Sequence, residues 1–203
     1  MSALPKPRYT LEEYFALELE SELKYEYWDG EVFVMSGASP EHETIVLNTS
    51  TGLDIALEGR PCRVFPSNLR VKVPAAPPYR YPDLTALCGE PIYETIGGVR
   101  ALTNPMLIAE VLSPSTESFD RGDKFNYYQS IPGFCEYLLL AQNGPRVGHY
   151  TKQADGRWLY EVVQGLETQL EIVSLGCALP LSRIYRNVNF ETAEKGKYPR
   201  MAE

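Results

Sequence analysis

An acidic residue inside an apolar strand is the most informative chemical feature of the sequence. Glu110 interrupts the run from Met106 to Leu112, whose other residues are all apolar. A run of this kind is typical of a strand that is buried on both faces of a sheet. A lone carboxylate in such a strand is costly unless a positive charge or a metal ion compensates it. Glu110 therefore has either a structural role or a metal-binding role. In the structural interpretation it pairs with an arginine or lies at an exposed strand end; in the other it binds a metal ion.

A second acid, Asp83, occupies a comparable place earlier in the chain. It lies in the predicted strand 80–87, and the intervening segment 89–103 is predicted to be a loop that lets this strand pair with 105–112. Carboxylate oxygens on adjacent strands are hard ligands that suit Mg²⁺ or Mn²⁺. The sequence therefore predicts a divalent-metal site at Asp83 and Glu110. The alternative is that both acids are structural.

The elements that must position these acids follow from local signals. Thr10 and Glu13 have the spacing of a capping box, Asp29-Gly30 is a hairpin turn, and Ser39-Pro40 can begin a helix. Helices are predicted at 10–22, 40–57 and 116–131. Strands are predicted at 24–28, 31–35, 62–65, 68–73, 80–87, 105–112, 135–141, 146–151, 157–163 and 169–173. This order predicts an α/β (α+β) fold in which helices flank a mixed central sheet, with extra antiparallel strands.

Length and composition bound the class of protein. The 203 residues fit one domain, since domains contain roughly 100–200 residues, and we expect one at 1–190 with a polar tail at 191–203. Apolar residues make up 44% of the chain, as in ordinary globular proteins. The net charge of -8 counts against nucleic-acid binding through positive charge alone, but carboxylates that hold a cation are compatible with it.

The remaining signals concern location and redox state. No apolar run reaches about 18 residues, and the N-terminus does not look like a secretory signal, so we expect a cytoplasmic protein without a membrane span. Disulfides are not expected in that compartment. The four cysteines are interpreted as small apolar residues, with a zinc site as the alternative. They are Cys62, Cys88, Cys135 and Cys177.

Several short motifs occur together in a fixed order over roughly 8–190. They are Asp29-Gly30-Glu31, Ser39-Pro40-Glu41-His42, Tyr81-Pro82-Asp83, Glu110-Val111-Leu112-Ser113-Pro114-Ser115-Thr116, Asp120-x-x-x-Lys124 and Glu136-Tyr137. This ordered set resembles a large family of uncharacterised bacterial proteins, which are restriction-endonuclease-like members of the PD-(D/E)XK nuclease superfamily.

The resemblance implies a central sheet with flanking helices and a Mg²⁺ or Mn²⁺ ion on Asp83 and Glu110. By analogy, the backbone carbonyl of Val111 is a further ligand, and Glu31 is a candidate third carboxylate. The implied reaction is hydrolysis of phosphodiester bonds in nucleic acid, with DNA favoured, by a metal-activated water. A homo-oligomer such as a dimer is expected, because nucleases of this superfamily often bring two sites to two strands.

The chain departs from the superfamily pattern at Leu112, where a lysine is expected. The resemblance implies that the basic role has moved to Lys124, which Asp120 can hold at i,i+4 spacing; the alternative is a solvated ion pair. Arg70 and Lys72 are the other candidate cations.

Two further questions stay open on the sequence. His42, near the start of a helix, either faces the cleft or is an ordinary core or surface histidine, and Tyr127 and Tyr128 are interpreted as packing residues. The competing functions are a catalytically degenerate binding or regulatory protein, favoured by Leu112 and the acidity, and a β-rich small-ligand binder. The second requires Asp83 and Glu110 to lie apart.

Overall fold

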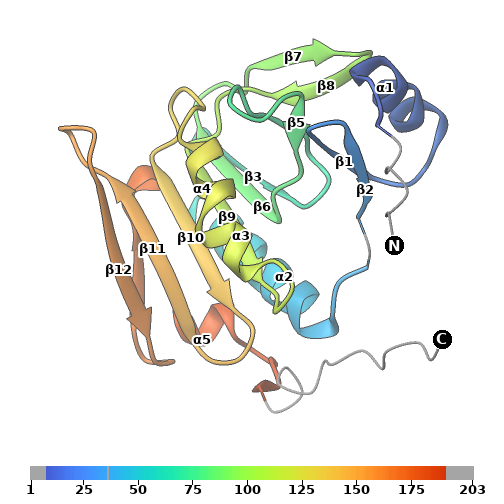
Figure 1. Ribbon diagram of the computed structural model, residues 1–203. Coiled ribbons are helices and arrows are strands. Elements are labelled where there is room, and N and C mark those ends of the chain that lie inside the picture. The colour runs from blue at the N-terminus through green and yellow to red at the C-terminus, as the bar shows by residue number, and fades with distance from the viewer. Residues whose placement is uncertain (1–7, 36, 191–203) are drawn as a thin grey trace, which may run out of the picture.

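A six-stranded mixed sheet lies at the centre of the computed structural model, which describes residues 8–35 and 37–190 (Figure 1). Its spatial order is β12-β11-β10-β9-β6-β3. The strands are β3 (Cys62–Pro66), β6 (Leu84–Cys88), β9 (Leu107–Leu112), β10 (Glu136–Ala141), β11 (Arg146–Lys152) and β12 (Trp158–Gln164). β9 and β10 run parallel, and the other neighbours run antiparallel. The strands β9 and β10 are buried along their whole length, which confirms the prediction made for β9 from its apolar run.

Each face of this sheet is covered by a different layer. One face packs against α2, α5 and the β13–β14 hairpin through an aliphatic core that includes Leu138 and Leu140. The other packs against α3, α4 and a four-stranded sheet of order β5-β4-β8-β7, through a core that includes Tyr137 and Leu139. The bounds are α2 (Pro40–Ala56), α3 (Glu117–Arg121), α4 (Asp123–Tyr128), α5 (Leu181–Ile184), the 3-10 helix η1 (Val173–Leu175), β4 (Val71–Lys72), β5 (Tyr79–Arg80), β7 (Tyr93–Ile96), β8 (Val99–Leu102), β13 (Gln169–Ile172) and β14 (Cys177–Pro180).

The N-terminal part forms a helix and a hairpin beside the small sheet (Figure 1). The predicted capping box is present: the Glu13 N–H donates to the Thr10 hydroxyl, and the Thr10 N–H donates to the Glu13 carboxylate. The hairpin turns at Asp29 and Gly30, both with positive φ, as a two-residue turn requires. The elements are α1 (Leu11–Glu20), β1 (Tyr25–Trp28) and β2 (Glu31–Val34).

The predicted fold class is confirmed, but four element predictions were wrong. The expected loop 89–103 contains the hairpin β7–β8, which turns at Gly97-Gly98. The expected helix 116–131 is two short helices, because Gly122 leaves helical geometry with φ -111° and ψ -99°. The expected strand 80–87 is divided between two sheets around Pro82, which cannot donate to a strand ladder. The strand expected at 68–73 is limited to β4.

The cysteine prediction also needs correction. Cys62 and Cys88 form a disulfide, although no disulfide was expected. The antiparallel register of β3 and β6 places these two residues directly opposite each other, with Cα atoms 3.9 Å apart. This proximity arises from strand pairing and is invisible in the local sequence around each cysteine. Cys135 and Cys177 are free, as predicted.

Two expectations concern the limits of the chain. The polar tail predicted at 191–203 lies outside the described residues. Among the residues that are described, no helix combines the length and apolar character needed to cross a membrane.

Candidate active site

The two predicted acids are brought together at one end of the β6–β9 pair. Asp83 directly precedes β6, and the antiparallel register places Leu84 opposite Ala109, so Asp83 reaches the level of Glu110. The Asp83 N–H lies 3.4 Å from Oε2 of Glu110. The small-ligand-binder alternative required these acids to lie apart, and this geometry contradicts it.

The backbone of Val111 also faces this position. Its N–H donates to Oδ2 of Asp83 at 2.8 Å. Asp83 directly precedes β6, so its side chain takes the place of a backbone acceptor from β6 at this position. In an antiparallel pair, the N–H and C=O of one residue face the same neighbour. The Val111 carbonyl, the ligand implied by family resemblance, is therefore directed to the same side of β9 as Asp83.

Lys124 is the cation of this cluster. Its amine lies 2.9 Å from Oε1 of Glu110 and 3.2 Å from Oδ1 of Asp120, and its side chain is only 11% exposed. Asp120 lies four residues before Lys124, on α3. Tyr128, also on α4, donates its hydroxyl to the same Glu110 oxygen at 2.7 Å. Tyr128 is thus both a packing residue and a hydrogen-bond donor to the candidate site, a role that the sequence did not indicate.

Burial and crowding of like charges dominate the electrostatics. Burial raises the pKa of Glu110 well above its ordinary value, and repulsion from Asp83 and Asp120 adds to this rise, while Lys124 opposes it. For Lys124, burial lowers the pKa, but Glu110, Asp120 and Glu26 outweigh it and raise the pKa well above normal. The carboxylates thus outnumber the one buried ammonium. An excess of buried negative charge of this kind is stabilised by a cation.

His42 supports Asp83 from the opposite layer. Ser39 caps α2 by accepting the His42 N–H at 3.1 Å, which fixes the histidine in the first turn. Nε2 of His42 lies 3.1 Å from Oδ2 of Asp83, and its buried Nδ1 finds no hydrogen-bond partner among the described residues. Burial lowers the pKa of His42, but the hydrogen bond and charge of Asp83 outweigh it, so the pKa is raised.

The same contacts act on Asp83. Burial raises the pKa of this carboxyl, but His42, the charge of Lys124 and the Val111 N–H together hold it below its usual value. Within the pair, the pKa of Asp83 is therefore lowered and that of Glu110 is raised.

Glu26 is an acid near the site that the sequence did not single out. It lies on β1, its Oε1 accepts the Tyr81 N–H at 3.4 Å, and its negative charge raises the pKa of both Lys124 and Tyr128. The candidate third carboxylate, Glu31, lies on the neighbouring strand opposite Trp28. Nothing local distinguishes Glu26 from other acids of an exposed hairpin, and only the packing of β1 against β5 brings it near Lys124.

The alternative cations are each paired with an acid other than Asp83 or Glu110. Nε and Nη2 of Arg70 donate to Oε2 of Glu18 at 3.0 and 2.8 Å, and Lys72 pairs with Glu94. The partners are 52 residues apart for Arg70 and Glu18 and 22 for Lys72 and Glu94, so local sequence patterns could not reveal these pairs.

The chemistry of the donor set fits a divalent cation. The hydrogen bonds shorter than 3.2 Å use Oδ2 of Asp83 and Oε1 of Glu110. The second oxygen of each carboxylate is therefore the one available to a metal, and hard oxygens are what Mg²⁺ and Mn²⁺ prefer. Within the described part of the chain, no group of three or more His, Cys, Asp or Glu side chains is arranged to hold a metal ion. A bound cation would therefore keep several water ligands, as Mg²⁺ commonly does.

Comparisons with known proteins show the family of this chain. The family model Uma2, described as "Putative restriction endonuclease", matches residues 11–182. Two proteins of Synechocystis sp. (strain ATCC 27184 / PCC 6803 / Kazusa) are similar over most of their length. "Uncharacterized protein slr1290" is 34% identical over 92% of this chain and 96% of its own, and "Uncharacterized protein sll1609" is 37% identical over 80% and 91%.

The fold is shared with a solved structure. A "putative nuclease belonging to DUF820" from Anabaena variabilis ATCC 29413 superposes with a TM-score of 0.66 at 18% identity, covering 87% of this chain and 97% of that one. At this identity the similarity concerns the fold. Together with the family match, it confirms the resemblance to restriction-endonuclease-like proteins.

Proposed function

Because this chain belongs to the Uma2 family, we propose that it is a Mg²⁺- or Mn²⁺-dependent endonuclease that hydrolyses phosphodiester bonds in nucleic acid, with DNA favoured. The observation that carries this proposal is the contact of Lys124 with Glu110 directly beside Asp83. Two carboxylates and one ammonium in a buried cluster are the groups that metal-assisted phosphodiester hydrolysis needs.

Each side chain has a role in the proposed reaction. Asp83 and Glu110 would hold the cation, together with the Val111 carbonyl. A cation bound there would lower the pKa of a water and neutralise charge that develops on the phosphate. The Lys124 ammonium stabilises the same developing negative charge, because its raised pKa keeps it protonated.

Two neighbours keep this arrangement in place. His42 holds the Asp83 carboxylate in one orientation, and Tyr128 fixes Oε1 of Glu110. Both are positioning residues, since neither needs to touch the reacting atoms. Their contacts favour a preorganised site, in which the charged groups need not reorient during the reaction.

A specific observation also favours the degenerate-nuclease alternative. Leu112 stands on β9 where the superfamily has its lysine, and the Lys124 amine is bound by two carboxylates. A protein that binds the metal and nucleic acid without turning it over would fit these facts. Activity and metal binding therefore have to be measured separately.

The test combines calorimetry with cleavage assays. Mn²⁺ binding is measured for the wild type, for Asp83→Asn and for Asp54→Asn, in which an exposed α2 acid is neutralised as a matched control. Cleavage of fluorescently labelled single-stranded DNA, duplex DNA and RNA is followed with each protein. The proposal requires Mn²⁺ binding and cleavage in the wild type and in the control, and their loss in Asp83→Asn. Binding without cleavage of any substrate would establish the degenerate alternative, and absence of both would refute the metal site.

Assembly is also part of the proposal. We expect a homo-oligomer such as a dimer, and β12 is the strand that supports such an assembly. It lies at the edge of the central sheet and exposes Leu159, Tyr160 and Val162. Edge strands with exposed apolar residues favour pairing with another chain. Light scattering after size-exclusion chromatography tests this, and a monomer at all concentrations would contradict it.

A further inference from the structure

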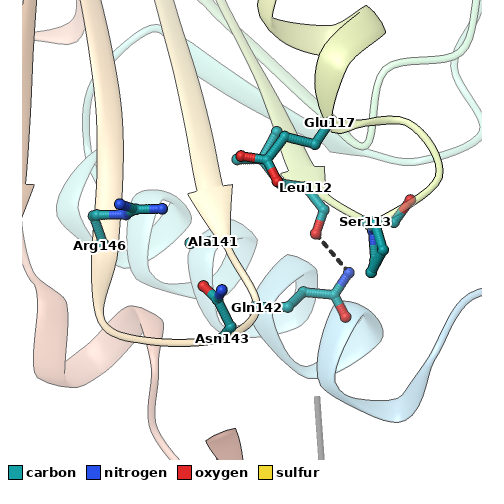
Figure 2. Close-up of a pocket in the computed structure, with 8 residues that line it drawn as sticks. Leu112, Ser113, Glu117, Ala141, Gln142, Asn143 and Arg146 are labelled. Carbon is teal, nitrogen blue, oxygen red and sulfur yellow. Dashed lines mark hydrogen bonds between the residues drawn. The ribbon is translucent and has the colours of Figure 1, made fainter. Parts of the chain in front are cut away.

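A pocket of about 390 Å³ opens where the parallel strands β9 and β10 end (Figure 2). Its walls come from both strand ends, from α3 and from the turn before β11. The lining residues are Leu112, Ser113, Pro114, Glu117, Ala141, Gln142, Asn143 and Arg146. Most of these side chains are polar, which favours a polar ligand over an apolar one.

The pocket continues the candidate active site along the same face of the sheet. Side chains two residues apart on a strand share a face, so Leu112 lies on the face of Glu110. The parallel register pairs Glu110 with Leu139 and Leu112 with Ala141, so the pocket begins one such step beyond the carboxylate. That step is about 6.6 Å, and successive nucleotides of a duplex strand advance about 3.4 Å along the axis. A nucleic-acid strand with one phosphate at Glu110 therefore reaches the pocket within about two nucleotides.

Arg146 supplies a positive charge to this pocket. The antiparallel register pairs Leu140 with Val147, which places Arg146 beside Ala141 on the same face. The side chain is exposed, and Figure 2 shows the guanidinium extending from β11 towards the strand end that carries Leu112. Across the residues that the structure describes, no carboxylate lies within ion-pair distance of it.

The other cations near the pocket are already engaged. Arg121 donates to Glu117 at 2.8 Å, which also neutralises the acid on the pocket wall, and Lys124 is held by Glu110 and Asp120. Arg146 is thus the cation that can bind an added anion without breaking an existing pair. A guanidinium binds phosphate oxygens through two parallel hydrogen bonds.

The amides beside Arg146 complete the pocket. Gln142 is fixed, because its Nε2 donates to the Leu112 carbonyl and its Oε1 accepts from Ser39, both at 2.8 Å. Asn143 is exposed at the rim and carries both a donor and an acceptor, as a base edge requires of its partner. Asn143 and Arg146 also line a second pocket, together with Gln164 and Gly165. The two residues are therefore shared by both pockets.

We propose that this pocket binds the nucleotide adjacent to the scissile phosphate, with Arg146 on its phosphate. The inference rests on the proposed function and deepens it, because it assigns part of the substrate to named residues of this chain. It makes Arg146 a binding residue and not a catalytic one.

The experiment measures binding of a fluorescein-labelled single-stranded oligonucleotide by anisotropy, with Ca²⁺ as the cation, over a series of salt concentrations. Arg146→Ala should weaken binding by about tenfold or more, as expected for loss of hydrogen bonds to a charged group. It should also reduce the slope of log affinity against log salt by about 0.7, the value for one phosphate contact on a single strand. The affinity of Arg146→Lys should lie between those of the wild type and Arg146→Ala, since lysine keeps the charge without the paired donors.

The matched control is Arg157→Ala. It removes the same charge from an exposed arginine at the opposite end of the β11–β12 hairpin, where Arg157 pairs with Asp155. Equal losses in the two variants, or no loss in Arg146→Ala, would overturn the pocket proposal. In that case wild-type cleavage in Mn²⁺ would leave the proposed function standing. A wild type that binds no oligonucleotide refutes both, and unchanged Mn²⁺ affinity in Arg146→Ala shows that the metal site itself is intact.

Discussion

Replacing Lys124 by methionine separates the catalytic proposal from a purely structural role. The substitution keeps much of the side-chain volume and removes the positive charge. It leaves Glu110 and Asp120 without the ammonium that lies 2.9 and 3.2 Å from them in the wild type. Because the group is buried, water cannot replace it fully.

The size of the effect follows from these distances. With an effective dielectric constant of about 20, a charge pair at 2.9 Å has a Coulomb energy of about 6 kcal/mol before desolvation is counted. Part of this is offset, since methionine does not have to be desolvated. Breaking one partner of a buried pair typically costs about 3–5 kcal/mol. We therefore expect Lys124→Met to lose about 3–5 kcal/mol of unfolding free energy in the absence of metal, and to fold only if the wild type has more than that.

Metal binding and turnover should change in opposite directions. Mn²⁺ affinity should rise, because the ammonium that opposes a cation at Glu110 is gone. Turnover should fall by about 10²–10⁴, because the charge that stabilises the reacting phosphate is missing. Mn²⁺ at 100 times its dissociation constant should restore about 2.7 kcal/mol of the lost stability.

Urea unfolding with and without Mn²⁺, calorimetry and the cleavage assay measure these three quantities. Lys152→Met, which neutralises an exposed lysine at the end of β11, is the control and should change none of them. If Lys124→Met were as stable as the wild type without metal, the stabilising role assigned to the buried ion pair would be refuted. If turnover were retained while stability fell, Lys124 would be structural only.

Three further predictions concern the surroundings of the site. Mn²⁺ affinity should rise with pH below the raised pKa of Glu110, by up to about tenfold per pH unit, because the cation must displace the proton of this carboxyl. Calorimetry in buffers of different ionisation enthalpy should detect the released proton. An affinity independent of pH would contradict this prediction. Tyr128→Phe leaves a buried Glu110 oxygen with one donor fewer and should cost about 1–3 kcal/mol in urea unfolding, whereas Tyr127→Phe, at a half-exposed position, should cost less. Reduction of the Cys62–Cys88 disulfide, whose cysteines are 26 residues apart, should lower the unfolding free energy by about 3.5 kcal/mol, and equal stability with and without reductant would show that the bond contributes nothing.

The sequence by itself determined the features that depend on a few neighbouring residues. The apolar run around Glu110 specified a doubly buried strand, and Asp29-Gly30 specified a hairpin turn. Ser39 with Pro40 specified the start of α2. In each case the backbone geometry is set by local hydrogen bonding and side-chain pattern, so a short window of sequence is sufficient. The proximity of Asp83 and Glu110 was also predicted, although the segment between them contains the hairpin β7–β8 and the expected strand 80–87 is divided at Pro82.

The tertiary structure decided which distant groups meet. His42 and Glu26 come from separate N-terminal elements and reach the candidate site only because α2 and β1 pack beside it. Arg70 carries the same charge as Lys124 but forms an ion pair with Glu18 on α1. Such contacts depend on strand register and on the packing of layers, and a shift of one residue turns a side chain to the opposite face of its sheet. The electrostatic character of this site is therefore a property of the folded chain, while the acids that compose its centre can be read from the sequence.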